Sequence, residues 1–379
     1  MPIVSGYIRD MRSIVLATGI YPPDIGGPAT YVRALAREFT KMGYEVTVVT
    51  YGEMQNAECR MQREEGWRVV KVRRNGGPLL RWWRYSRALR KYAANTDSIE
   101  AFSSVSVGVP LALACLKRPK KVLRLGGDFF WERYTDRGGR QPLRTWYATR
   151  PIRRWCMGGL LRTFDFLIFS SRFQQDIFEE HFRLPEHCVI ENAFVGGTPQ
   201  VHIAHRPLRL LFFGRFVPFK NILELLKAVS CHRNVRLTLV GEGPQHCLIE
   251  NLVERLGLQL RVMLVSPVDG EEIRSIFSTH DLLILPSLTE ISPNTALEAR
   301  SAGLPVLLTK ETGLSEEFTS GMKLTDLSTA DLITAALREA EDRYGAFAAE
   351  ASSQIPKREW RTVAQEHVEV FEQLCGKDQ

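Results

Sequence analysis

Residues 285–309 read LPSLTEISPNTALEARSAGLPVLLT. The stretch follows an apolar run that predicts a buried strand, changes to a loop with Glu290, and then to a helical pattern that contains Glu298. We place Pro293 in the first turn of that helix, because the first turn leaves unpaired the N–H that proline lacks. An apolar run at 305–308 predicts the next strand. This order of strand, loop, helix and strand is typical of a parallel α/β sheet.

The loop and helix start after this strand favour the binding of an anion. Unpaired amides at a helix start point at whatever lies beyond the strand end, and the helix dipole attracts negative charge. A diphosphate fits there, flanked by Glu290 and Glu298, whose carboxylates can accept hydrogen bonds from sugar hydroxyls. The alternative is that both glutamates only solvate or cap the helix. The residues expected at the helix start are Ser292, Pro293, Asn294 and Thr295.

The same alternation of short strands and helices extends along the chain and predicts two doubly wound α/β domains that face each other across a cleft. The predicted strands are 13–18, 45–51, 67–72, 121–125 and 166–170 in the first half, and 208–213, 235–240, 261–265, 282–285 and 305–308 in the second. We expect a first domain at 1–195, a linker rich in Gly and Pro at 196–207, a second domain at 208–356 and a last helix within 357–379 that crosses back to the first domain.

A second motif follows the first predicted strand of the second domain, where residues 212–221 read FFGRFVPFKN. Gly214 permits close approach of the backbone to a ligand. Arg215 and Lys220 are two cations near one strand end, and they can neutralise a diphosphate leaving group as its charge develops. The alternative for such residues taken alone is a solvated arginine and lysine.

Two glycine-containing loops are further candidates for the donor site. Residues 18–30 read TGIYPPDIGGPAT, and two of its glycine amides lie near a predicted helix start, where they can face an anion. Residues 240–244 read VGEGP, whose glycines can let the backbone approach a nucleotide or can simply form a turn. The four glycines are Gly26, Gly27, Gly241 and Gly243.

These motifs together resemble the retaining glycosyltransferases of family 4, also called glycosyl transferases group 1. Glu290 and Glu298 have the separation of that family's E-x7-E signature, and 212–221 is similar to its G-R-x-x-x-x-K-G/N pattern. The resemblance extends over nearly the whole chain and implies the GT-B fold, with two Rossmann-like domains and the nucleotide-sugar in the second. It also implies that Glu290 contacts the donor sugar and that Glu298 contacts the ribose.

One position departs from the family pattern. Family members commonly have a histidine after the fourth strand of the first domain, close to the reacting sugar, whereas this chain has Gly126, Gly127 and Asp128 there. We expect Asp128 to orient a sugar hydroxyl or to stabilise positive charge at the anomeric carbon. The alternative is that Asp128 caps the next helix. With Glu290, Arg215 and Lys220, it makes up the expected catalytic set.

The first domain contains a strongly basic segment. Residues 68–162 have 22 Lys or Arg against five Asp or Glu, although the net charge of the whole chain is only +7. Within it, 80–94 read LRWWRYSRALRKYAA, a helical pattern with its cations on one face. Such a face suits the headgroup region of an anionic membrane, and the alternatives are solvated helix faces or single-stranded nucleic acid. The expected membrane residues are Trp82, Trp83, Arg84, Arg87, Arg90 and Lys91.

The resemblance implies transfer of a hexose or N-acetylhexosamine from a nucleoside diphosphate sugar, UDP before GDP, to a lipid-linked, polysaccharide or lipopolysaccharide acceptor. Arg215 and Lys220 can supply the positive charge, and the cysteines have no zinc-ligand spacing, so we expect neither metal nor cofactor. Nucleic acid is not an expected partner. No apolar run approaches the ~20 residues of a membrane span, so we expect a cytoplasmic protein, peripheral on the inner face of the membrane. The alternatives are a nucleotide-sugar-binding protein without activity and an epimerase or phosphorylase of the same fold.

Overall fold

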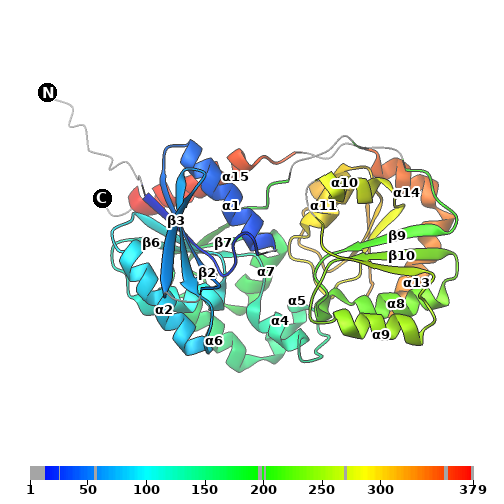
Figure 1. Ribbon diagram of the computed structural model, residues 1–379, viewed down its shortest axis with the longest axis horizontal. Helices are drawn as coiled ribbons and strands as arrows, with labels where there is room; N and C mark the ends of the chain where they lie inside the picture. The colour runs from blue at the N-terminus through cyan, green and yellow to red at the C-terminus, as the bar shows by residue number, and fades with distance from the viewer. Residues whose placement is uncertain are drawn as a thin grey trace.

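The computed structural model has two parallel β-sheets, each with helices on both faces, arranged side by side along the longest axis of the molecule (Figure 1). Within the residues that the structure describes, the first sheet has eight strands and the second has six. The predicted architecture of two doubly wound α/β domains is therefore confirmed. The structure describes residues 13–24, 26–54, 58–194, 199, 202–268, 271–353 and 357–376.

The first sheet has the strand order β3-β4-β2-β1-β5-β6-β7-β8, and its pairs are parallel except for β3 with β4. Its strands are β1 (Ser13–Ala17), β2 (Glu45–Gly52), β3 (Cys59–Glu64), β4 (Trp67–Arg73), β5 (Ser98–Ala101), β6 (Lys120–Leu125), β7 (Phe166–Phe169) and β8 (Glu186–Val189). Its helices are α1 (Gly27–Lys41), α2 (Pro78–Tyr92), the π-helix η1 (Ser104–Gly108), α3 (Val109–Ala114), α4 (Phe129–Thr135), α5 (Leu143–Trp146), the 3₁₀ turn η2 (Tyr147–Thr149), α6 (Pro151–Leu161) and α7 (Arg172–His181).

The second sheet is entirely parallel, with the order β11-β10-β9-β12-β13-β14. Its strands are β9 (Leu208–Phe213), β10 (Val235–Val240), β11 (Val262–Val265), β12 (Leu282–Leu285), β13 (Val306–Thr309) and β14 (Met322–Thr325). Its helices are the 3₁₀ turn η3 (Pro218–Lys220), α8 (Ile222–Cys231), α9 (His246–Arg255), α10 (Glu271–Ser278), α11 (Asn294–Ser301), α12 (Glu316–Thr319), α13 (Ala330–Asp342) and α14 (Tyr344–Ala351).

Four strands have no counterpart among the predicted ones: β3, β5, β8 and β14. The central strands β1, β9 and β12 are buried apolar runs, which is the pattern of a parallel sheet covered on both faces. In contrast, β3 has the mostly exposed sequence CRMQRE at a sheet edge, and β8 reads EHCV. These segments are strands because they pair with neighbouring strands of the sheet, and their sequences do not have an apolar pattern that would predict this.

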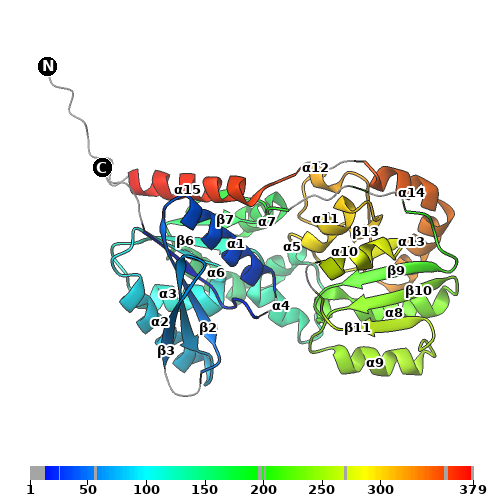
Figure 2. The same ribbon diagram turned by 45° about the horizontal axis from the view of Figure 1, so that its top comes forward.

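The last helix, α15 (Trp360–Gly376), lies along the first domain beside α1 (Figure 2). A fully buried polar contact fixes it there. Nε2 of His367 lies 2.9 Å from the hydroxyl of Tyr31 on α1, and Nδ1 lies 3.1 Å from Oε2 of Glu100 on β5. The residues of α15 around His367, including Val363 and Phe371, join the apolar core on that face of the first sheet.

We expect His367→Ala to lower the free energy of unfolding by about 3 kcal/mol, because the substitution leaves the buried Glu100 carboxyl and Tyr31 hydroxyl without this partner. Urea denaturation followed by circular dichroism measures the change. His246→Ala is the matched control, since His246 pairs with Glu250 at the surface, and its effect should stay within about 0.5 kcal/mol. Equal effects of the two substitutions would contradict an anchoring role for His367.

Candidate functional site

The candidate site lies where the strand order of the second sheet reverses, between the neighbouring strands β9 and β12. The chain passes from β9 to β10, toward one edge of the sheet, and from β12 to β13, toward the other edge. The loops after β9 and β12 therefore diverge and leave a crevice at the carboxyl ends of these two strands. The loop after β9 is the 214–220 motif, and the loop after β12 contains Glu290. The two strongest sequence motifs therefore meet at one end of one sheet.

Lys220 and Glu290 are in direct contact at this end of the sheet. Nζ of Lys220 donates to Oε1 of Glu290 over 2.6 Å, and Oγ of Ser287 donates to the same oxygen over 2.5 Å. The Glu290 residue is only 5% exposed. Its backbone is also fixed, because its N–H donates to the carbonyl of Glu311 and its carbonyl accepts from the N–H of Gly313. A buried carboxylate and a half-buried ammonium group thus satisfy each other at the strand end.

Arg215 points across the domain boundary. Its guanidinium lies 3.8 Å from Oε2 of Glu132, which belongs to α4 of the first domain. Burial raises the pKa of Glu132, and the positive charges of Arg215 and Lys220 oppose that rise. Both predicted cations therefore lie close enough to lower the pKa of one carboxylate of the opposite domain.

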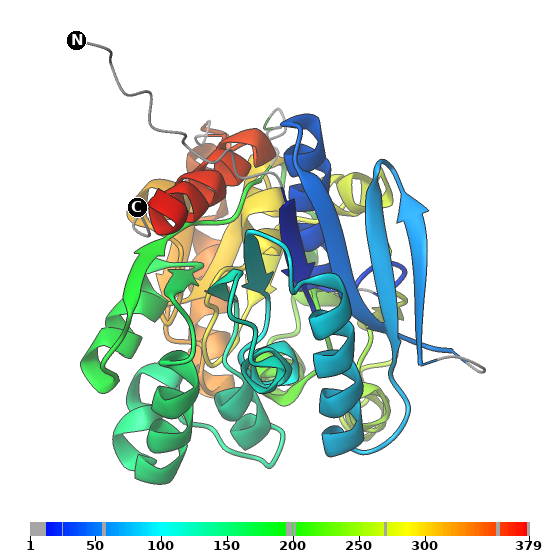
Figure 3. The ribbon, with the colours of Figure 1, turned by 90° about the vertical axis from the view of Figure 1, so that its left-hand side faces the viewer.

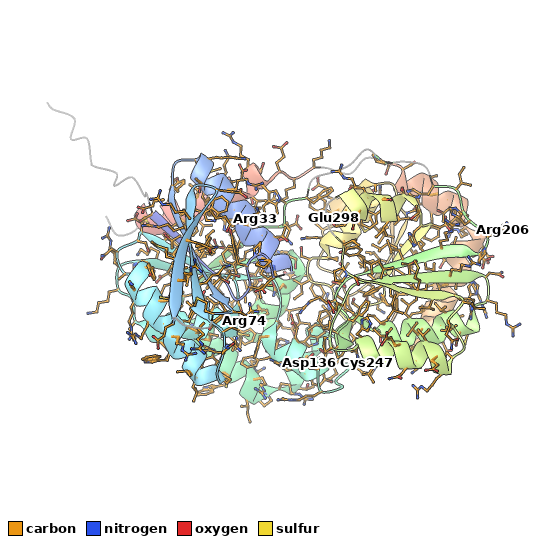
Figure 4. The ribbon with its side chains drawn as sticks, viewed as in Figure 1. Arg33, Arg74, Asp136, Arg206, Cys247 and Glu298 are labelled. Atoms are coloured by element: carbon orange, nitrogen blue, oxygen red, sulfur yellow. The ribbon has the colours of Figure 1, made fainter. Side chains whose placement is uncertain are left out.

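Glu298 lies on α11, at the boundary between the two domains (Figure 4). The residue is exposed, yet the surrounding protein partly desolvates its carboxyl and raises its pKa. Pro293 directly precedes α11, one position earlier than predicted, and Thr295 is half-buried in its first turn. The side chain of Glu298 is thus available to a ligand between the domains.

The start of α11 is tied to the first domain through Asn192. Nδ2 of Asn192 lies 2.9 Å from both Oγ of Ser292 and Oδ1 of Asn294. The N–H of Asn294 donates to the carbonyl of Ser292, so it is not one of the unpaired amides that we expected here. Arg124 on β6 in turn donates to Oδ1 of Asn192 over 2.6 Å. Ser292 and Asn294 therefore join the domains, while their predicted contact with the donor stays a prediction.

The predicted glycines differ in their surroundings. A Cβ on Gly241 would lie 1.9 Å from the carbonyl oxygen of Gly214, and one on Gly243 would lie 2.6 Å from that of Phe216. These two glycines allow the turn after β10 to pack against the loop that contains Arg215. They therefore act on the donor site indirectly, through the position of that loop. Gly26 directly precedes α1, and a Cβ on the next residue, Gly27, would meet no described atom within 4 Å.

Asp128 caps α4, as in the alternative interpretation of the sequence. Oδ1 accepts from the N–H of Trp131 over 2.8 Å, and Oδ2 accepts from the hydroxyl of Tyr147 over 2.5 Å. The residue is 1% exposed, and burial raises its pKa to about 6 against these hydrogen bonds. These contacts favour helix capping for Asp128, so a direct role at the sugar is only a prediction.

Sequence reasoning missed the residues of the first domain that close the site. Arg140 donates to Oδ1 of Asn221, the residue after Lys220, and the N–H of Leu143 donates to Oγ1 of Thr289, the residue before Glu290. Trp131 packs against Phe219 with ring centroids 5.3 Å apart. Glu132 completes this set. All lie far along the chain from the residues that they contact, and no local pattern marks such pairs.

The predicted membrane face lies on α2. Trp83 is 48% exposed, and Arg87, Arg90 and Lys91 are exposed. The guanidinium of Arg90 donates to the carbonyls of Leu113 and Ala114 at the end of α3. Trp82 and Arg84 are half-buried, and Arg84 donates to the carbonyl of Asn75. Part of this face is therefore engaged within the domain, and its binding to a membrane stays a prediction.

The described residues include neither a cluster of metal ligands nor a membrane-spanning helix. Among these residues, no group of three or more His, Cys, Asp or Glu side chains is placed to hold a metal ion. Within the same part of the chain, no helix combines the length and the apolar character needed to cross a bilayer.

Two family models match successive parts of the chain. The glycosyl transferase 4-like domain matches residues 26–193, and glycosyl transferases group 1 matches residues 198–351. The chain belongs to the group 1 glycosyltransferases. The first match covers the strands of the first sheet from β2 to β8, and the second covers all strands of the second sheet. The second match includes Arg215, Lys220, Glu290 and Glu298.

Curated relatives of the chain include named glycosyltransferases. This group 1 glycosyltransferase is 25% identical to a D-inositol 3-phosphate glycosyltransferase of Corynebacterium kroppenstedtii, over 93% of this chain and 86% of the relative. It is 27% identical to the GPI3 subunit of the phosphatidylinositol N-acetylglucosaminyltransferase of Saccharomyces cerevisiae, over 48% of this chain and 42% of the relative. Several relatives match over only 27% to 44% of their own length, so the chain spans less than half of each.

The fold is similar to that of solved glycosyltransferases. Sucrose-phosphate synthase from Thermosynechococcus elongatus superimposes with a TM-score of 0.79 and 20% identity, over 97% of this chain and all of that chain. Anabaena HepE in complex with UDP and glucose superimposes with a TM-score of 0.67 and 16% identity, over 95% and 99% of the two chains. The GT-B fold expected from the sequence of this group 1 glycosyltransferase is therefore confirmed.

The raised pKa of Asp128 predicts a dependence of stability on pH. A folded-state pKa of about 6, above the ordinary value of 3.8, means that folding favours the protonated carboxyl. Stability is then lost as pH rises from about 4 to 6. We expect the free energy of unfolding of the parent, relative to Asp128→Asn, to fall by roughly 2 kcal/mol between pH 4 and pH 7. Urea titrations of both proteins test this, and a difference that stays constant with pH would contradict it.

Proposed function

We propose that the chain is a retaining glycosyltransferase that moves a hexose or N-acetylhexosamine from a nucleoside diphosphate sugar, UDP first, to a lipid-linked or glycan acceptor at the inner face of a membrane. The contact between Lys220 and Glu290 at the strand ends is the single observation that supports this proposal most directly. HepE, which has a similar fold, was solved with UDP and glucose. The name of the yeast relative states a lipid acceptor, phosphatidylinositol.

The proposed reaction uses charges that already surround the crevice. On donor binding, Lys220 shares its ammonium between Glu290 and the diphosphate, and Arg215 turns from Glu132 to the same group. Glu290 then accepts a hydrogen bond from a sugar hydroxyl, and Glu298 accepts one from the ribose. The cations stabilise the negative charge that develops as the bond from C1 to the phosphate oxygen breaks.

The acceptor hydroxyl attacks C1 from the same face that the diphosphate leaves, which retains the configuration. Its proton passes to the departing phosphate oxygen, so one C–O bond forms as the other breaks and the proton is accounted for. In this proposal the side chains position the two substrates and stabilise the developing charge, and none forms a covalent intermediate with the sugar. Asp128 acts through α4, by holding the helix that presents Glu132 toward Arg215.

We expect Lys220→Gln to weaken the binding of UDP at least about tenfold, because it removes one charge-assisted hydrogen bond to the diphosphate. The glutamine amide can still donate a hydrogen bond to Glu290, so we expect the variant to fold as the parent does. Isothermal titration calorimetry with UDP, GDP and ADP gives the affinities and the preferred base.

Lys227→Gln is the matched control, since Lys227 lies on α8 and pairs with Glu224 at the surface. This variant should bind UDP as the parent does. Equal weakening in both variants, or none in Lys220→Gln, would contradict the proposed site. Release of UDP from UDP-glucose and UDP-N-acetylglucosamine with phosphatidylinositol vesicles then tests turnover. Tight binding without release from either donor would favour a binding protein.

A further inference from the structure

Large apolar side chains are exposed on one side of the first domain. Among the described residues, thirteen large apolar side chains are exposed, and six of them lie on α2, α3 and α6, which have only 15, 6 and 11 residues. All three helices contact η1. Figures 1 and 3 both show α2 and α6 at the end of the first domain opposite α15. The six residues are Leu79, Leu80, Trp83, Leu113, Ile152 and Trp155.

The first half of α6 has the most exposed part of this surface. Its first six residues, PIRRWC, are all exposed, and Ile152 and Trp155 are each 76% exposed. Residues three apart lie on the same side of a helix, so these two side chains form one apolar face. The second half of α6 is held in the domain by the buried side chains of Met157 and Leu161. A firmly anchored helix thus presents an apolar tip to the outside.

The segment of the chain that contains this tip has charges of one sign. Residues 137–164 contain seven arginines and no Asp or Glu. Arg153 and Arg154 are exposed on α6 itself, and the guanidinium of Arg153 lies 5.4 Å from the ring centroid of Phe130. A second copy of the same face would bring like charges together, which disfavours a symmetric dimer here. An anionic partner with an apolar layer just below its charge fits both features.

We propose that the first turns of α6, together with the exposed apolar residues of α2 and α3, insert into the headgroup region of an anionic phospholipid bilayer. Ile152 and Trp155 enter the boundary between headgroups and acyl chains, while Arg153 and Arg154 contact lipid phosphates. This proposal extends the surface predicted on α2. It rests on the proposed function, because an enzyme whose acceptor lies in a membrane has to bind that membrane.

The position of α6 connects the membrane to the crevice. The connection between β6 and β7 contains α4, whose Glu132 faces Arg215, and then α5 and α6. Leu143 at the start of α5 contacts Thr289 of the second domain. One connection therefore contributes both to the first-domain wall of the site and to the proposed membrane contact.

Co-sedimentation with vesicles tests the proposal. The probes are vesicles of phosphatidylcholine alone and of phosphatidylcholine with about a third phosphatidylglycerol. We expect the parent to bind the anionic vesicles at about 0.1 M salt and to release them at about 1 M. Ile152→Ser with Trp155→Ser should lower the partition coefficient at least about tenfold, because two apolar side chains no longer insert. Arg153→Gln with Arg154→Gln should lower it about tenfold for the anionic vesicles.

Leu248→Ser with Leu260→Ser is the matched control, since these side chains are 56% and 94% exposed on the second domain, and this variant should bind as the parent does. UDP binding should be equal in all variants, which separates this proposal from that of the donor site. A parent that binds neither vesicle, or an Ile152 and Trp155 variant that binds as the parent does, would overturn the proposal. A parent dimer that this variant dissociates would assign the face to a second copy and also overturn it.

Discussion

The contact between Lys220 and Glu290 is the interaction on which the site depends. A buried carboxylate and a half-buried ammonium group lie where the loops after β9 and β12 diverge, and placing either charge there without the other would cost free energy. Their presence at this point follows from the strand order, since only neighbouring strands whose connections leave in opposite directions open a crevice. A bound diphosphate can replace part of the negative charge that Glu290 provides to Lys220, and a sugar hydroxyl can then donate to Glu290.

The two domains are joined by contacts that surround this crevice rather than by the linker alone. Trp131 packs on Phe219, and Asn192 holds the start of α11. The apolar core of the first domain continues into the second through Val217, Phe219, Leu288 and Ile291. These contacts come from the segments that flank Lys220 and Glu290, so the relative position of the domains and the geometry of the site are set by the same residues.

Much of the fold was predictable because central parallel strands are buried on both faces and appear as apolar runs, as β9 (LRLLFF) and β12 (LLIL) do. The strands β5 (SIEA) and β14 (MKLT) each contain a charged residue and give no apolar run, so their pairing with neighbours determines their conformation. In the site, the spacing of the motifs pointed to Lys220 and Glu290. Glu132 and Asn192 approach from the other domain and leave no local pattern, while the sequence allowed both roles of Asp128 equally.

The most direct test of the account is a crystal structure of the protein with a UDP-sugar analogue that cannot be transferred. We expect the diphosphate at the ends of β9 and β12, with Nζ of Lys220 within about 3.2 Å of a phosphate oxygen and the Glu290 carboxylate bound to a sugar hydroxyl. A nucleotide bound elsewhere, with the contact between Lys220 and Glu290 unchanged, would contradict it.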